Sequence, residues 1–164
     1  SSRRRHTRSL CDWSSDVCSS DLRSLSNRTV LNSFDWELLE ECNLLAPNMP
    51  RSYLSQLPES SDDPFDRPPE ELSPDFSSFT GSIPEAIQVA GGHLWCPYFK
   101  DVTTDLVAEA HSLGLPVCTW TVNEVEDIEN MIDIGVDGII TDYTDRAKNI
   151  FKSRGLRWQL FGEH

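Results

Sequence analysis

Basic residues are scarce in this 164-residue sequence, where 14 Lys and Arg stand against 27 Asp and Glu and the net charge is −13. Nucleic acids and anionic membrane surfaces bind clustered Lys and Arg, so neither is expected as a partner. The sequence also lacks any apolar run near the roughly 20 residues that a helix needs to cross a bilayer. We therefore expect no membrane span.

Cysteines at metal-ligand spacing are absent as well. Cys11 and Cys18 lie in an unusual N-terminal segment, and Cys42, Cys96 and Cys118 are scattered over the remainder. Short Cys-x-x-Cys spacings, which are typical of zinc sites, do not occur. An odd number of cysteines outside the N-terminal segment argues against a disulfide framework, and a small buried thiol is the expected state of Cys118.

Residues 1–22 have no hydrophobic periodicity. Arginines crowd residues 2–8, and residues 12–22 read DWSSDVCSSDL, which resembles a translated sequencing adapter. The alternative is a genuine disordered or targeting arm, but no apolar segment follows the arginines as a signal peptide requires. We expect this segment to contribute nothing to the fold, which we assign to residues 23–164.

The clearest predicted elements are a strand, a helix and a second strand within residues 117–142. Val117–Val122 alternates β-branched and aromatic residues, as strands do. Asn123 is the expected N-cap of the helix, with Glu126 completing a capping box. The expected buried face of this helix comprises Val125, Ile128, Met131 and Ile132.

Gly135 is expected to end that helix in the left-handed conformation. The apolar run Val136–Ile140 then predicts a strand buried on both faces, as in a parallel sheet. Further strands are predicted at residues 29–33, 51–56 and 93–96, and further helices from Trp36, from Pro84, over 104–113 and over 146–153. The chain thus alternates strand and helix four or five times.

One segment interrupts this alternation. Residues 57–83 contain five prolines among many Asp, Glu and Ser, which predicts a long irregular loop. If it follows a barrel strand, it projects over the C-terminal ends of the strands and could cover a ligand there. The alternative is an excursion without any ligand role.

Several short sequence motifs, taken together, resemble those of the glycerophosphodiester phosphodiesterase family. They are Asn32–Trp36, Trp95–Phe99, Glu109–Leu115, Trp120–Asn123 and Gly135–Asp142, and the resemblance covers roughly residues 28–157. It implies an α/β fold that is the C-terminal half of a (β/α)₈ TIM barrel, because a complete barrel needs about 250 residues. One departure is Thr144, which stands where the family has a proline.

The resemblance implies that the parent protein hydrolyses a glycerophosphodiester to an alcohol and glycerol 3-phosphate. The family uses two histidines and a divalent metal, Mg²⁺ or Ca²⁺, held by carboxylates. Its motifs His-Arg-Gly, Glu-x-Asp, His-Asp and Glu-x-Lys do not occur here in the expected role. We therefore expect no catalytic or metal-binding residues in this chain, and an inactive fragment. His111, near a helix end, is expected to be exposed or half-buried.

The resemblance places substrate-binding residues at the ends of two strands. Phe34 and Trp120 match aromatic residues that line the pocket for the alcohol, and an indole could also donate its N–H to one oxygen. Ser33, Thr121 and Asn123 lie beside them. The alternatives are a core role for Trp120 and a capping role for Asn123.

Two other functions stay open for the parent. One is a phospholipase-type barrel that cleaves another diester, and the second is a catalytically dead barrel that acts as a binding module. In all cases half a parallel barrel leaves unpaired strand edges, so the fragment is expected to associate with itself.

Overall fold

A computed structural model of the chain describes residues 29–57 and 80–156. The predictions for residues 1–22 and for most of the loop 57–83 lie outside this range. In chain order the elements are β1 Leu31–Ser33, α2 Trp36–Leu45, β2 Arg51–Ser55, α3 Ile83–Val89, β3 Leu94–Pro97, the 3₁₀ helix η3 Phe99–Asp101, α4 Thr104–Ser112, β4 Cys118–Thr119, α5 Val125–Ile134, β5 Gly138–Ile139 and α6 Thr144–Ser153.

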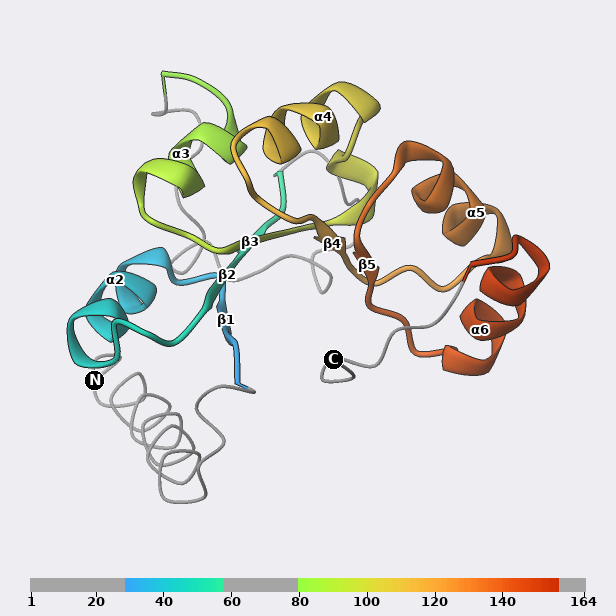
Figure 1. Cartoon of the computed structure of the whole chain (residues 1–164), viewed down its shortest axis with the longest axis horizontal. Helices are drawn as coiled ribbons and strands as arrows, with labels where there is room; N and C mark the ends of the chain where they lie inside the picture. The colour runs from blue at the N-terminus through green and yellow to red at the C-terminus, as the bar shows by residue number, and fades with distance from the viewer. Residues whose placement is uncertain (1–28, 58–79, 157–164) are drawn as a thin grey trace.

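All strand pairs in this part of the chain are parallel. β1, β2 and β3 form one sheet in that order, and β4 pairs with β5. Two parallel bridges, Trp95 with Val117 and Tyr98 with Trp120, join β3 to β4. The strands therefore follow one another in chain order, and the helices form an arc on one side of them (Figure 1). This confirms the predicted alternation of strand and helix.

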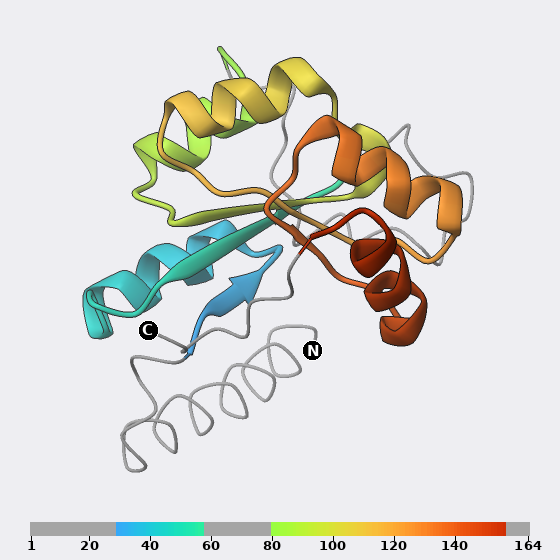
Figure 2. The same cartoon turned by 45° about the vertical axis from the view of Figure 1, so that its right-hand side comes forward.

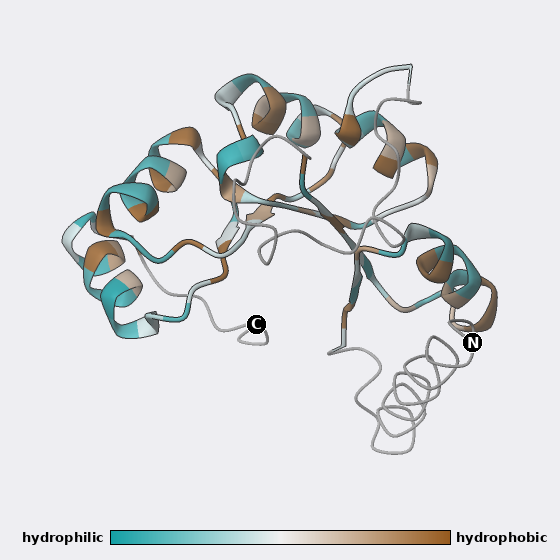
Figure 3. Cartoon of the chain, turned by 180° about the vertical axis from the view of Figure 1, so that it is seen from behind, coloured by the Kyte–Doolittle hydropathy of each residue, from teal (hydrophilic) through white to brown (hydrophobic). Residues whose placement is uncertain are grey.

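The core lies between the strands and the helices. On β2 and β3, Tyr53 and Trp95 are almost completely buried, and the Tyr53 ring meets the Trp36 ring of α2 edge-on at 5.0 Å. The indole N–H of Trp95 donates to the Ser55 hydroxyl at 2.9 Å. Apolar residues of the helices alternate with polar ones along the ribbon (Figure 3). This patterning explains why each helix covers the sheet with one side.

A second apolar cluster lies between α5 and α6, which pack side by side (Figure 2). Ile128 and Met131 of α5 meet Ala147 and Ile150 of α6, as the helical spacing predicts. Val125 was expected on the same face, but it is 44% exposed. It occupies the first position of α5.

Side-chain caps start several helices. Asp35 accepts a hydrogen bond from the backbone of Leu38 at 2.9 Å, and Thr103 accepts one from Leu106 at 3.3 Å. Ser82 and Glu85 form a full capping box ahead of Pro84. Each cap satisfies a backbone N–H that has no partner inside its helix.

Two predictions in the 117–142 segment are wrong. The N-cap of α5 is Glu124 and not Asn123, and no side chain caps this helix. β5 is not buried on both faces, since both its residues are half-buried and Ile140 is 42% exposed. Among the described residues β5 pairs only with β4, so it is an edge strand. Gly135 does end α5 with a φ of 92°, as expected.

Gly92 lies where no side chain fits. A Cβ atom at this position would stand 2.9 Å from the Tyr53 ring and even closer to Ile87. We expect Gly92→Ala to lower the free energy of unfolding by about 1–3 kcal/mol, the usual cost of overpacking a core. Urea unfolding followed by circular dichroism measures this. The exposed helix residue Gln88 is the control, because Gln88→Ala should change stability by less than about 0.5 kcal/mol.

Candidate substrate-binding site

The carboxyl ends of the parallel strands carry the predicted site residues. Ser33 ends β1 and Phe34 follows it, whereas Trp120 and Thr121 follow β4. Parallel strands end at a common edge of the sheet, so these residues gather although they are far apart in the sequence. Substrate sites of parallel barrels lie at this edge.

Aromatic rings form a continuous wall there. The Phe34 and Trp120 ring centroids lie 5.4 Å apart, with the rings nearly perpendicular at 86°. Tyr98 adds a ring 5.3 Å from Trp120, and Phe99 adds another 5.0 Å from Tyr98. We call Phe34, Tyr98, Phe99 and Trp120 the aromatic wall. Edge-on and tilted pairs at these distances are favourable, so the rings hold one another in place.

Tyr98 was not predicted as a site residue. Tyr98 belongs to the site because it pairs with Trp120 across the two strands. This pairing depends on the register of β3 and β4, which the sequence alone does not reveal. Lys100 in η3 reaches the outer side of the same group, with its ammonium 6.0 Å from the Tyr98 ring centroid. It brings a positive charge next to the aromatic wall.

The indole N–H of Trp120 is already engaged. It donates to the backbone carbonyl of Cys96 at 2.8 Å. The expectation that this group could hold a substrate oxygen is therefore wrong for the described conformation. The hydrogen bond instead fixes the indole plane, and Trp120 is half-buried.

The Ser33 and Asn123 side chains are engaged in hydrogen bonds within the protein. The Ser33 hydroxyl accepts a hydrogen bond from the Asp35 backbone at 3.0 Å and so shapes the turn after β1. The Asn123 side-chain carbonyl accepts from the Thr141 hydroxyl at 3.1 Å and from the Asp142 backbone at 3.0 Å. Its amide donates to the Asp142 carboxylate at 2.9 Å. Asn123 thus ties the loop after β4 to the loop after β5.

Arg146 reinforces the same two loops. Its guanidinium donates to the backbone carbonyl of Asn123 and lies 3.5 Å from the Glu124 carboxylate. It also lies over the Tyr143 ring, 4.4 Å from the centroid. The Asp142 carboxylate accepts from the Asn123 amide and so bonds the neighbouring loop. Thr144 is the first residue of α6.

Some buried polar groups near the strands have no hydrogen-bond partner among residues 29–57 and 80–156. Both side-chain amide atoms of Gln56 and the carbonyl oxygen of Asn32 are buried without a hydrogen bond. Gln56 directly follows β2 and is only 3% exposed. Burying an amide without a hydrogen bond costs free energy. These positions therefore indicate where hydrogen-bonding groups from elsewhere would fit. The residue types and their spacing in the sequence did not predict these unpaired groups.

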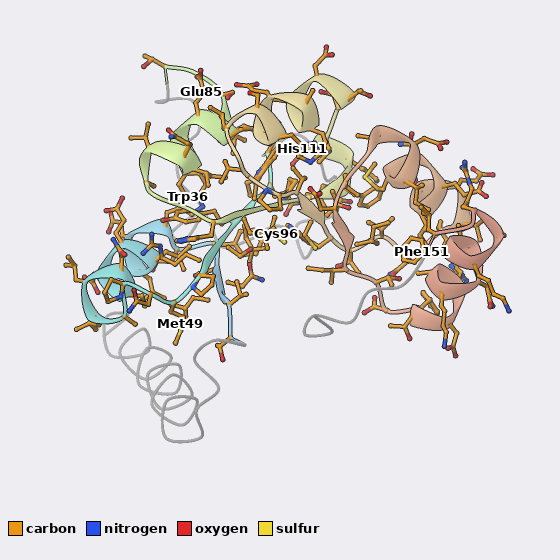
Figure 4. The ribbon with its side chains drawn as sticks, viewed as in Figure 1. Trp36, Met49, Glu85, Cys96, His111 and Phe151 are labelled. Carbon is orange, nitrogen blue, oxygen red and sulfur yellow. The ribbon has the colours of Figure 1, made fainter. Side chains whose placement is uncertain are left out.

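The two histidines within the described residues, His93 and His111, lie away from the aromatic wall. His111, near the end of α4, bonds the Asp137 carboxylate at 2.8 Å, and the same carboxylate oxygen accepts from the backbone of Val117 at 2.8 Å (Figure 4). Its side chain is 42% exposed, as predicted. Val117 immediately precedes β4, so this pair lies at the amino ends of the strands. Burial, and then the nearby Arg51, lowers the pKa of His93, which precedes β3.

A metal does not fit the described residues. Over residues 29–57 and 80–156, no group of three or more His, Cys, Asp or Glu side chains could hold an ion.

No helix in this part of the chain is long and apolar enough to cross a membrane. A hollow of about 350 Å³ next to α3 and Leu113, the residue after α4, lies in the helix layer, apart from the aromatic wall.

Comparison with protein families decides the relationship. The model of the glycerophosphoryl diester phosphodiesterase family matches residues 4–146. The chain belongs to this family. The matched range begins within the N-terminal segment that we left out of the fold, a segment outside the described residues.

Solved structures of the family have the same fold. A family protein from Silicibacter pomeroyi is 50% identical, with a TM-score of 0.79 over 89% of this chain and 45% of its own. A glycerophosphodiester phosphodiesterase from Parabacteroides distasonis is 25% identical, with a TM-score of 0.65 over 85% of this chain and 50% of its own. The chain therefore corresponds to about half of a family TIM barrel.

Two further relatives complete the comparison. A glycerophosphodiester phosphodiesterase from Caldanaerobacter subterraneus is 37% identical over 59 residues, which is 24% of its length. An Oleispira antarctica phosphodiesterase, 14% identical with a TM-score of 0.58 over 75% of this chain and 41% of its own, was solved with the product sn-glycerol 3-phosphate. At that identity the likeness shows the fold alone.

Replacing Asn123 tests its role as a tie between the two loops. Asn123→Leu removes three side-chain hydrogen bonds, and we expect it to lower the free energy of unfolding by about 1–2 kcal/mol. Hydrogen exchange of the Asp142 amide, which loses its acceptor, should accelerate. Asn130→Leu on the exposed side of α5 is the matched control and should leave both quantities unchanged. Unchanged exchange at Asp142 in Asn123→Leu would contradict the tie.

Proposed function

We propose that this chain is part of a glycerophosphodiester phosphodiesterase, in which it supplies the pocket wall for the alcohol part of the substrate. The observation that carries the proposal is the aromatic wall at the carboxyl ends of the strands. Family membership supports it.

The wall suits a small polyol or its head-group partner. The faces of Phe34 and Trp120 offer apolar area to carbon atoms, and Tyr98 brings a hydroxyl that can donate or accept. Ser33 and Thr121 border the wall, while Asn123 holds the neighbouring loops in register. In this proposal these residues orient the substrate and make no bond to its phosphorus.

Hydrolysis needs further groups. A phosphodiester requires stabilisation of the charge that develops on phosphorus and a proton donor for the leaving alkoxide. A divalent ion such as Mg²⁺ or Ca²⁺ would supply the first, but its ligands have to come from outside the described residues. The isolated chain is proposed to be inactive for this reason.

Two alternatives remain for the parent protein. A phospholipase-type barrel would share the late strands but cleave a different diester, and a dead barrel would bind without turnover. The absence of His-Arg-Gly and Glu-x-Asp from an otherwise whole parent barrel would favour the binding module. Turnover of a phospholipid, with none of a glycerophosphodiester, would favour the first.

A chimeric barrel tests the proposed role of Trp120. This chain from residue 29 onward would follow the amino-terminal half of the Silicibacter pomeroyi relative, to which it is 50% identical. We expect metal-dependent release of glycerol 3-phosphate from glycerophosphocholine. Trp120→Ala should raise KM about tenfold while kcat and metal affinity are kept, because lost ring area weakens binding without touching the reacting atoms.

Three controls accompany the chimera. Trp120→Phe keeps a ring face and should recover most of the affinity. The isolated 164-residue chain should release no glycerol 3-phosphate with either ion. A Trp120→Ala chimera with unchanged KM but a collapsed thermal transition would make Trp120 a core residue and refute the pocket role.

We also propose that the isolated chain associates with itself. β1 and β5 each lack a second strand partner among the described residues, and Val30 and Ile140 beside them are 49% and 42% exposed. Unpaired edges of this kind invite pairing with another chain. Gel filtration with light scattering should find dimers or larger species. A monomer with a sharp two-state calorimetric transition would contradict this.

A further inference from the structure

Cys96 of β3 and Cys118 of β4 lie directly opposite each other. The parallel bridges pair Trp95 with Val117 and Tyr98 with Trp120, so the register between them pairs Cys96 with Cys118. Their neighbours on the outer strands are Leu54 and Gly138. The two thiols therefore occupy adjacent places in one row that crosses four strands.

Both thiols are on the sheet face opposite the helices. Trp95 and Val117, the residues just before the cysteines, are buried in the cluster under the helices. Side chains alternate between the two faces of a strand, so the cysteines point the other way. Cys96 is 1% exposed and lies near the middle of the sheet (Figure 4), whereas Cys118 is half-buried.

The spacing of the pair suits a covalent link. Neighbouring strands lie about 4.7–4.9 Å apart, within the roughly 4.4–6.8 Å between Cα atoms that a disulfide spans. The thiols are free but already hydrogen-bond to each other. A Cβ atom at Gly138 would stand 2.9 Å from the Cys118 sulfur, so this glycine leaves room for the thiol.

The two thiols are also chemically unequal. Cys96 donates to Cys118, which lowers the pKa of Cys118 and raises the pKa of Cys96, with burial adding to the rise. The half-buried thiol is therefore the better nucleophile, and the buried one serves as its partner.

We propose that Cys96 and Cys118 form an oxidation site, in which hydrogen peroxide converts the two thiols into a disulfide between β3 and β4. The Cys118 thiolate attacks one peroxide oxygen, the O–O bond breaks, and hydroxide leaves, so that Cys118 becomes a sulfenic acid. The Cys96 sulfur then attacks that sulfur, the S–O bond breaks, and water leaves. Overall two thiols and one peroxide give one disulfide and two waters.

The site adjoins the aromatic wall. The backbone carbonyl of Cys96 accepts the indole N–H of Trp120 at 2.8 Å, so the residue that would be oxidised also fixes the Trp120 ring. The oxidation itself needs no phosphodiesterase activity and stands or falls separately from the proposed function.

Peptide mapping of the whole chain tests the proposal. The reduced, folded protein is treated with hydrogen peroxide, free thiols are alkylated, and the products are digested with trypsin. Cleavage after Lys100 puts Cys96 and Cys118 on different peptides, and Cys42 falls on a third. We expect one linked pair, Cys96 with Cys118, with the loss of two hydrogen atoms and of alkylation at both cysteines.

Cysteine variants provide the controls. Cys42→Ser should leave the link intact, and Cys96→Ser should abolish it while Cys118 proceeds to higher oxidation states. Peroxide treatment in urea should lose the preference for this pair. The proposal is overturned if Cys96 and Cys118 of the folded chain remain alkylated while Cys42 is oxidised, or if wild-type Cys118 becomes sulfinic acid with no link.

Discussion

The parallel register of β2, β3 and β4 is the constraint on which the described structure depends. It places Tyr53, Trp95 and Val117 on the face covered by the helices, where their burial drives folding. The same alternation sends Cys96 and Cys118 to the other face and brings Tyr98 beside Trp120. A slip of one residue would exchange the two faces, so core and site are specified together.

The sequence predicted the elements well because their signals are local. Pro84 at the start of α3 and Gly135 after α5 each act within a few residues of an element end. The resemblance to the family, which rests on short motifs at strand ends, is confirmed by the match to the family model. Local chemistry was therefore enough for fold class and family.

What the sequence missed depends on contacts between distant segments. Asn123 had the residue type of an N-cap, but its amide bonds the loop after β5 instead. Tyr98 joined the aromatic wall and the Trp120 N–H found the Cys96 carbonyl only through the register of β3 and β4. Partners 18 to 24 residues apart cannot be chosen from local patterns.

The engaged indole of Trp120 has a consequence for selectivity. Because the indole N–H already donates to a backbone carbonyl, the ring discriminates between ligands by the area and shape of their contact with its face. It does not discriminate by a hydrogen bond to a ligand oxygen. Apolar contact discriminates weakly, by about 1–3 kcal/mol for a methylene group, whereas a dedicated hydrogen bond rejects its missing partner far more strongly. In the proposed enzyme this wall would tolerate a range of alcohols, and strict recognition would fall to the polar groups that hold the phosphate.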